Sequence, residues 1–103
     1  MPQLQSLLRT VAFESITVAD SATRLTIGNV LGNSGQSMAE AVTILVETAQ
    51  LRWRDDGTDP TSSVGNLANV GSILRIENRN RILAFRAIRT GSTSATLRVN
   101  YYA

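Results

Sequence analysis

Residues 41–65 have the sequence AVTILVETAQLRWRDDGTDPTSSVG, which holds the longest apolar run, the only tryptophan and the densest charge cluster of the chain. In its first part, Val42, Ile44 and Val46 alternate with residues of the opposite face, which is the period of a β-strand. The run is rich in β-branched residues and has no glycine or proline, so we expect a strand over residues 41–49 and not a short helix.

The alternation resumes after a short break, with Leu51 and Trp53 on one side and Arg52 and Arg54 on the other. The residues DDGTDP at 55–60 then end it, because aspartate favours turns, glycine accepts a positive φ and proline cannot donate to a strand ladder. This stretch therefore predicts two strands followed by a wide turn.

The rest of the chain repeats short alternating stretches, with turn signals every eight to twelve residues and no convincing helix. We therefore predict an all-β fold, a single β-sandwich or a small jelly-roll-like barrel of about seven short antiparallel strands. Residues 1–10 form an N-terminal arm in this interpretation, and residues 11–103 form a single β domain. The predicted strands cover residues 11–18, 24–27, 41–49, 51–54, 72–77, 82–89 and 94–102.

Four local expectations complete this fold prediction. A bulge near Ser15 is expected to bring Phe13 and Ile16 to the same face. Residues 28–37, with three glycines and two asparagines, are expected to form a flexible surface loop. Residues 61–71 are expected to be a long, polar connection that reaches the core only at Val64, Leu67 and Val70, and residues 78–81 a polar turn.

The composition excludes several function classes. The chain has 103 residues, enough for one domain, and it contains neither cysteine nor histidine. Disulfides, the usual zinc sites, nucleophile systems built on histidine and histidine acid–base chemistry are therefore excluded. No catalytic set of residues stands out, so we expect neither an enzyme nor a cofactor.

All ten basic residues are arginine, and the net charge is only +2. Arginine bias in a GC-rich genome explains this, and so does selection for interfaces, where the planar guanidinium binds carboxylates. The arginines are spread along the chain, so we expect no nucleic-acid partner. No run approaches the roughly 18 apolar residues of a membrane span, and the first residues lack the features of a signal peptide, so we expect no membrane association.

Two residue groups have both a functional and a structural interpretation. Asp55, Asp56 and Asp59 are spaced to bind calcium, but the rest of a calcium-binding loop is missing, and a solvated turn explains them as well. Trp53, with the terminal tyrosines, offers a sugar-binding platform, but its phase with Leu51 favours packing in the core.

Arg86 and Arg89 flank another apolar strand. They serve either local ion pairs or a subunit contact.

The strand and turn residues resemble a pattern in small virion proteins of tailed bacteriophages, several of which are similar to head decoration or cement proteins. The resemblance spans most of the chain and concerns strand and turn residues, not chemistry. The loop at 28–37 has no counterpart in it. The matching segments are residues 13–18, 25–26, 46–61 with Gly65, 85–89 with the Gly-Ser-Thr turn at 91–93, and 95–102.

The resemblance implies a non-enzymatic structural protein, made in the host cytoplasm, that binds the outer phage head and holds capsid subunits together. Its expected partners are the major capsid protein or other virion proteins, and copies of itself in a homo-oligomer, with a trimer favoured. The alternatives are a tail, connector or fibre-associated virion module and, from another class, a carbohydrate-binding module. The candidate interface residues, chosen for exposure and reach, are Leu4, Leu7, Leu8, Arg52, Arg54, Asp55, Asp56 and Asp59.

Overall fold

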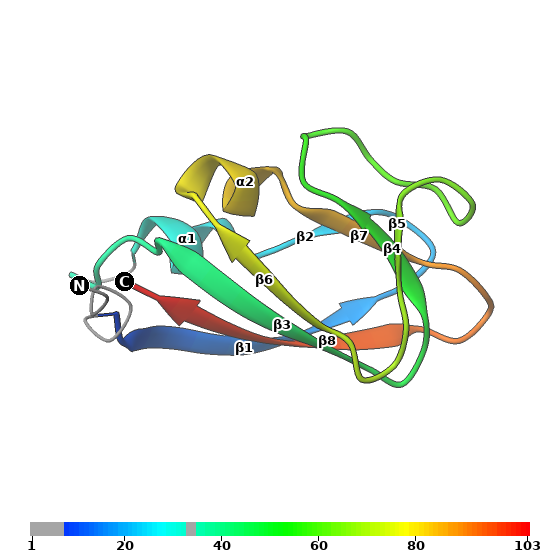
Figure 1. Cartoon of the computed structure of the whole chain (residues 1–103), viewed down its shortest axis with the longest axis horizontal. Coiled ribbons are helices and arrows are strands. Elements are labelled where there is room, and N and C mark those ends of the chain that lie inside the picture. Colours follow the sequence, from blue (N-terminus) through cyan, green and yellow to red (C-terminus); the bar gives the residue numbers. More distant parts are fainter. Residues whose placement is uncertain (1–7, 33–34) are drawn as a thin grey trace, which may run out of the picture.

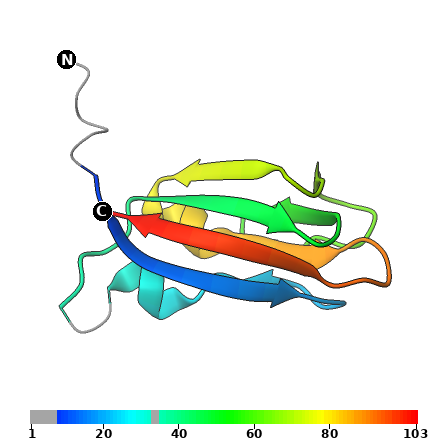
Figure 2. The ribbon, with the colours of Figure 1, turned by 90° about the horizontal axis from the view of Figure 1, so that it is seen from below.

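Two antiparallel sheets of four strands face each other in a computed structural model, which describes residues 8–32 and 35–103. The first sheet has the strand order β1-β8-β3-β6, and the second has the order β2-β7-β4-β5. Figure 2 shows the first sheet face on, with its strands in this order as blue, red, green and yellow-green ribbons. The predicted all-β sandwich is confirmed, with eight strands where about seven were expected.

The strand pairing follows one rule: the first strand pairs with the last, the second with the seventh, the third with the sixth and the fourth with the fifth. Strands β1 to β4 thus lie antiparallel to strands β8 to β5, and successive pairs go to alternate sheets. This arrangement is the eight-stranded jelly roll. Two further ladders, β3 with β8 and β4 with β7, join the pairs into complete sheets.

The strands and two short helices follow one another along the chain as Figure 1 shows. Both helices cap the same end of the sandwich and contact each other. No helix among the described residues is long and apolar enough to cross a bilayer. The elements are β1 (Thr10–Val18), β2 (Thr23–Arg24), α1 (Ile27–Leu31), β3 (Ala41–Glu47), β4 (Leu51–Arg54), β5 (Asn66–Ala68), β6 (Ile73–Glu77), α2 (Arg79–Ala84), β7 (Arg86–Arg89) and β8 (Ala95–Tyr102).

The core lies between the sheets and follows the predicted alternation in β3 and β8. Burying these aliphatic and aromatic side chains is the main stabilising contribution, about 25 cal/mol for each Å² of apolar surface removed from water. Strand β8 matters most, because it pairs with both β1 and β3 at the centre of its sheet. The inward residues of these two strands are Val42, Ile44, Val46, Ala95, Leu97, Val99 and Tyr101, all at most 1% exposed.

The predicted turn at 78–81 and the first half of the predicted strand at 82–89 are wrong, because residues 79–84 form helix α2. Asn78 has a positive φ of 91° and its side-chain oxygen accepts a hydrogen bond from the Asn80 amide, which is an N-terminal helix cap. The helix turns Ile82 into the core, and the strand begins only at Arg86. The expectation of no helix is thus wrong here and at α1.

Other local expectations also need correction. Strand β1 has its irregularity between Thr10 and Ala12, not near Ser15, so Phe13 stays on the outer face and is 56% exposed. Residues 27–31 of the predicted strand and loop form α1. The segment 61–71 contains β5, and its Val64, Leu67 and Val70 are exposed instead of buried, whereas Ala68 enters the core.

Candidate functional site

Three arginines lie in one row across the outer face of the β2-β7-β4-β5 sheet. Arg24 on β2 is the register partner of Arg86 on β7, which in turn is opposite Arg54 on β4. Residues in register on neighbouring strands have Cβ atoms about 5 Å apart, and like charges in these positions destabilise a sheet. We call Arg24, Arg86 and Arg54 the arginine row.

The loop between β4 and β5 supplies carboxylates to two members of the row. Arg54 binds Asp56 through two hydrogen bonds, of 3.1 Å from Nε and 2.5 Å from a terminal nitrogen. The bond from Arg54 lowers the pKa of the Asp56 carboxyl below its ordinary value. Arg86, whose side chain is only 17% exposed, has a longer contact of 3.4 Å with Asp59, which is 71% exposed.

The side chain of Arg24, at the edge of the row, has no ion pair or hydrogen bond with any described residue. It is exposed on the short strand β2, which is an edge of the sheet. Carboxylates thus contact Arg54 and Arg86, whose guanidinium also donates to the Leu83 and Phe85 carbonyls, but none contacts Arg24. Alternation alone did not single out Arg24, because the strand that carries it has only two residues.

Arg52 holds the same loop in place instead of presenting its charge. Its guanidinium donates to the backbone carbonyls of Ser62, at 3.2 Å, and Gly65, at 3.0 Å. Gly65 has a φ of +140°, and a Cβ there would lie 3.1 Å from the Pro60 Cβ and 3.2 Å from the Arg52 Cβ. The loop therefore packs tightly onto the sheet at the position where the sequence has glycine.

The predicted aspartate cluster is divided among three arginines. Asp55 pairs with Arg81 of α2 at 2.7 Å, while Asp56 and Asp59 pair with the arginine row. Within the described residues, no three side chains of the metal-ligating types come together. The solvated-turn interpretation, with arginines as counter-ions, thus accounts for these aspartates.

The charge of the chain is concentrated on this side of the molecule. Five arginines, namely the row with Arg52 and Arg81, lie near the three loop aspartates, whereas the rest of the chain has five arginines and five carboxylates, equal in number. The formal net charge of +2 therefore belongs to the arginine row and its surroundings.

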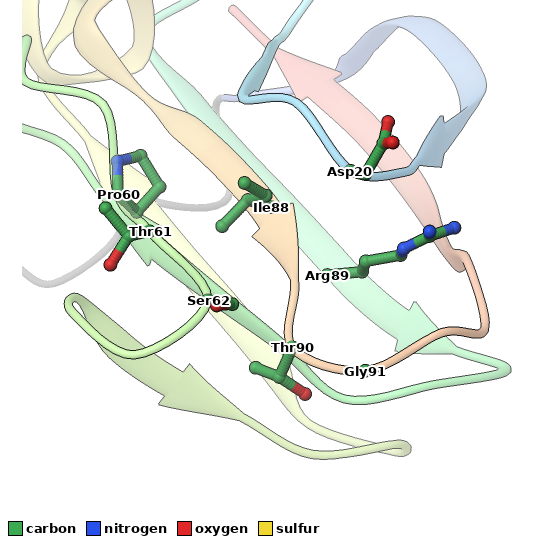
Figure 3. A pocket seen from close by; sticks show the side chains of 8 residues that line it. All are labelled: Asp20, Pro60, Thr61, Ser62, Ile88, Arg89, Thr90 and Gly91. Atoms are coloured by element: carbon green, nitrogen blue, oxygen red, sulfur yellow. The ribbon is translucent and has the colours of Figure 1, made fainter.

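A hollow of about 440 Å³ opens beside this face (Figure 3). Ile88 of β7 lies at its centre in the view, with Pro60 and Thr61 of the loop on one side and Asp20 and Arg89 on the other. Ser62, Thr90 and Gly91 complete its lining. Arg89 donates to the Ser94 hydroxyl at 3.1 Å, so it braces the neighbouring turn.

A separate polar network lies at the inner side of β1. Glu14 accepts hydrogen bonds from the buried Tyr101 hydroxyl and from Thr26, whose Oγ1 is 2.6 Å away and whose amide is 3.2 Å away. Burial by itself raises the pKa of the Glu14 carboxyl, but these hydrogen bonds outweigh it and leave the pKa below its ordinary value. Burial also raises the pKa of Tyr101, so the phenol stays protonated. The network joins β1, β8 and the start of α1.

The aromatic residues considered for sugar binding are engaged in packing. The half-buried Trp53 ring stacks on Phe85, with 5.8 Å between centroids. Tyr101 is buried, and the Tyr102 ring lies beneath the guanidinium of Arg75 while its hydroxyl is 3.0 Å from the Thr43 hydroxyl. The core interpretation of Trp53 is supported, because its ring packs on the fully buried Phe85.

The predicted interface residues do not form one surface. Arg52, Arg54 and the aspartates lie together around the arginine row. Leu8 is half-buried just before β1, at the edge of the opposite sheet, where the adjacent Arg9 exchanges 3.0 Å backbone hydrogen bonds with Ala103. Leu4 and Leu7 lie outside the described residues.

Four exposed apolar residues lie on or beside the two edge strands β5 and β6, which follow one another in the chain, and we call them the apolar stripe. They are Leu67 of β5, Ile73 of β6, which is 71% exposed, and Val64 and Val70 of the adjoining segments. Single exposed apolar residues are normal, but four in ten residues of chain mark this side as suited to contact with another molecule.

No known protein family, curated protein or solved structure matches this chain.

Proposed function

We propose that this chain is a virion structural protein of the decoration or cement type, which binds the outer surface of a phage head and links capsid subunits. The resemblance of its strand and turn residues to those of small phage virion proteins supports a place in the virion. The jelly-roll topology agrees with it, since the same topology builds many viral capsid domains. A fold by itself does not determine function, so the proposal depends on the surface features as well.

The observation that carries the contact function is the arginine row. Like charges in register weaken an isolated sheet, and a partner that brings carboxylates relieves this repulsion. The apolar stripe on β5 and β6 supports a second contact, which we assign to copies of the same chain in a homo-oligomer, a trimer being favoured. A module of the tail, connector or fibres would use the same surfaces and differs only in the number of copies.

The carbohydrate-binding alternative has less support. Jelly rolls also include lectin domains, but sugar platforms need an exposed aromatic face. The Trp53 ring stacks on Phe85, and the Arg75 guanidinium lies over the Tyr102 ring.

The test is quantitative mass spectrometry of purified particles made by the genome that encodes this chain. We expect copies of this chain near parity with copies of the major shell protein. A few copies per particle would assign it to the connector, tail or fibres. Absence from the particles would overturn the virion proposal.

A further inference from the structure

We propose that the Arg24 end of the arginine row binds a carboxylate-bearing segment of a neighbouring virion protein. This inference rests on the proposed function and names the chemistry of the partner. It follows from how the three arginines of the row differ in the partners they already have.

Pairing with carboxylates decreases along the row from β4 to β2. The Arg54 guanidinium donates two hydrogen bonds to one carboxylate. Arg86 has one 3.4 Å contact with a carboxylate and otherwise donates to the backbone carbonyls of Leu83 and Phe85, whereas the Arg24 side chain has no ion pair or hydrogen bond with the described residues. The three positions are in register and separated by one strand spacing, about 4.8 Å. A partner carboxylate at Arg24 therefore extends the row of arginine–carboxylate contacts that Asp56 and Asp59 make with Arg54 and Arg86.

The loop aspartates show which anion the row accepts. Guanidinium groups bind carboxylates and phosphates alike, but here both partners in place are carboxylates supplied by a peptide segment. A second acidic segment placed beside Arg24 binds in the same way and shares Arg86, whose contact with Asp59 is long and exposed.

A nucleic acid fits this surface less well. Nucleic-acid affinity comes from many phosphate contacts, and this side of the molecule has an excess of only two positive charges next to three aspartates. A polyphosphate chain would meet Asp56 and Asp59 beside the arginines. We therefore assign the row to a protein partner.

The experiment measures binding of a fluorescein-labelled hexaglutamate peptide to the whole chain by anisotropy at low salt. We expect the substitution R24Q to weaken binding about two- to fivefold, as for an exposed ion pair, and R24E to weaken it about tenfold. The matched control is R98Q on the opposite sheet, which removes an arginine already paired with Glu47 and should leave binding unchanged.

A third substitution tests the sharing of Arg86. D59N removes the exposed loop carboxylate and frees Arg86, so we expect hexaglutamate to bind about twofold more tightly. Weaker binding in D59N would overturn the inference that a partner carboxylate shares Arg86 with Asp59.

Equal binding by the wild type and R24Q, or an equal loss in R98Q, would overturn the inference, as would tighter Arg24-dependent binding of a labelled ten-nucleotide oligo-dT. The copy number in particles separates this inference from the proposed function. If the wild-type chain is absent from particles, the proposed function fails whatever the peptide result. If the wild type is present and R24E keeps the same copy number, the inference fails and the function stands.

Discussion

The outer faces of the two sheets use arginine in opposite ways. On the β1-β8-β3-β6 sheet, Arg98 pairs with Glu47 of the adjacent strand at 2.8 Å, and Arg75 pairs with Glu77 of its own strand at 2.9 Å. On the β2-β7-β4-β5 sheet the three arginines of the row are in register with one another, and their carboxylates come from a loop.

The difference lies in what each face needs in order to be neutral. The first face is neutralised by residues of the sheet itself, so its pairs form whenever the sheet forms. The second face depends on the conformation of residues 55–65, and it is still incomplete at Arg24. A face of this kind can exchange one set of carboxylates for another, which is the property a docking surface requires.

The largest expected effect comes from detaching the loop from the second face. We expect G65A to lower the free energy of unfolding by about 2–3 kcal/mol, because an alanine at φ +140° is strained and its Cβ meets Pro60 and Arg52. The measurement is urea unfolding followed by Trp53 fluorescence. G57A is the control, because its φ of +85° is also unfavourable but nothing lies within 4 Å of the added Cβ, so its cost should be about 1 kcal/mol. Equal effects would show that the loop does not pack on the sheet as described.

The half-buried carboxylate of Glu14, at the inner side of β1, gives the next largest effect. We expect E14Q to cost about 1 kcal/mol near neutral pH, because the amide accepts weaker hydrogen bonds from Tyr101 and Thr26 than the carboxylate does.

The contribution of Glu14 to the free energy of unfolding depends on pH. The pKa of Glu14 is lower in the folded protein, so the carboxylate stabilises the fold above about pH 4.5 and this stabilisation disappears as the pH falls through the folded pKa. The raised pKa of Tyr101 acts in the opposite direction, with stability lost above about pH 10. Urea midpoints from pH 3 to 11 test both limbs, and a constant difference between wild type and E14Q at acid pH would contradict the assignment.

The smallest effect tests the comparison of the two faces most directly. We expect R98Q to lower the free energy of unfolding by about 0.5 kcal/mol, since it breaks the pair with Glu47, whereas R24Q should leave it unchanged or raise it by a similar amount. R24Q removes one like charge from the row and breaks no described bond. Both differences should shrink in 0.5 M salt, because salt screens exposed charges. A loss of stability in R24Q would mean that Arg24 already has a structural partner.

The sequence predicted those parts of the fold that a period of two residues can encode. In β8, apolar and polar residues alternate as far as Tyr101, and in β3 the residues Val42, Ile44 and Val46, predicted to share one face, are all buried. The segment 61–71 misled the prediction, because Val64, Leu67 and Val70 look like core residues but are exposed, Leu67 on the outer side of the edge strand β5 and the two valines beside it. Helix α2 was missed because its six residues are too few to show a helical period, and only the cap at Asn78 marked its start.

The candidate site was predicted in part. Arg52, Arg54 and the aspartates were named because they are close together in the sequence. Arg24 and Arg86 join them only through the pairing of β2 with β7 and of β7 with β4, which connects residues far apart in the chain. Register between distant strands depends on tertiary structure, so no local pattern could bring Arg24 to the row.

The pairing of the first strand with the last has a consequence for how the chain folds. Strand β8 is the shared neighbour of β1 and β3, so until residues 95–102 are available β1 has no partner in its sheet and β3 is paired only with β6. Contacts this distant in sequence close slowly, typically in milliseconds to seconds for such β folds. During synthesis β1 and one edge of β3 are therefore unpaired, and they avoid pairing with other chains only if β8 reaches them quickly.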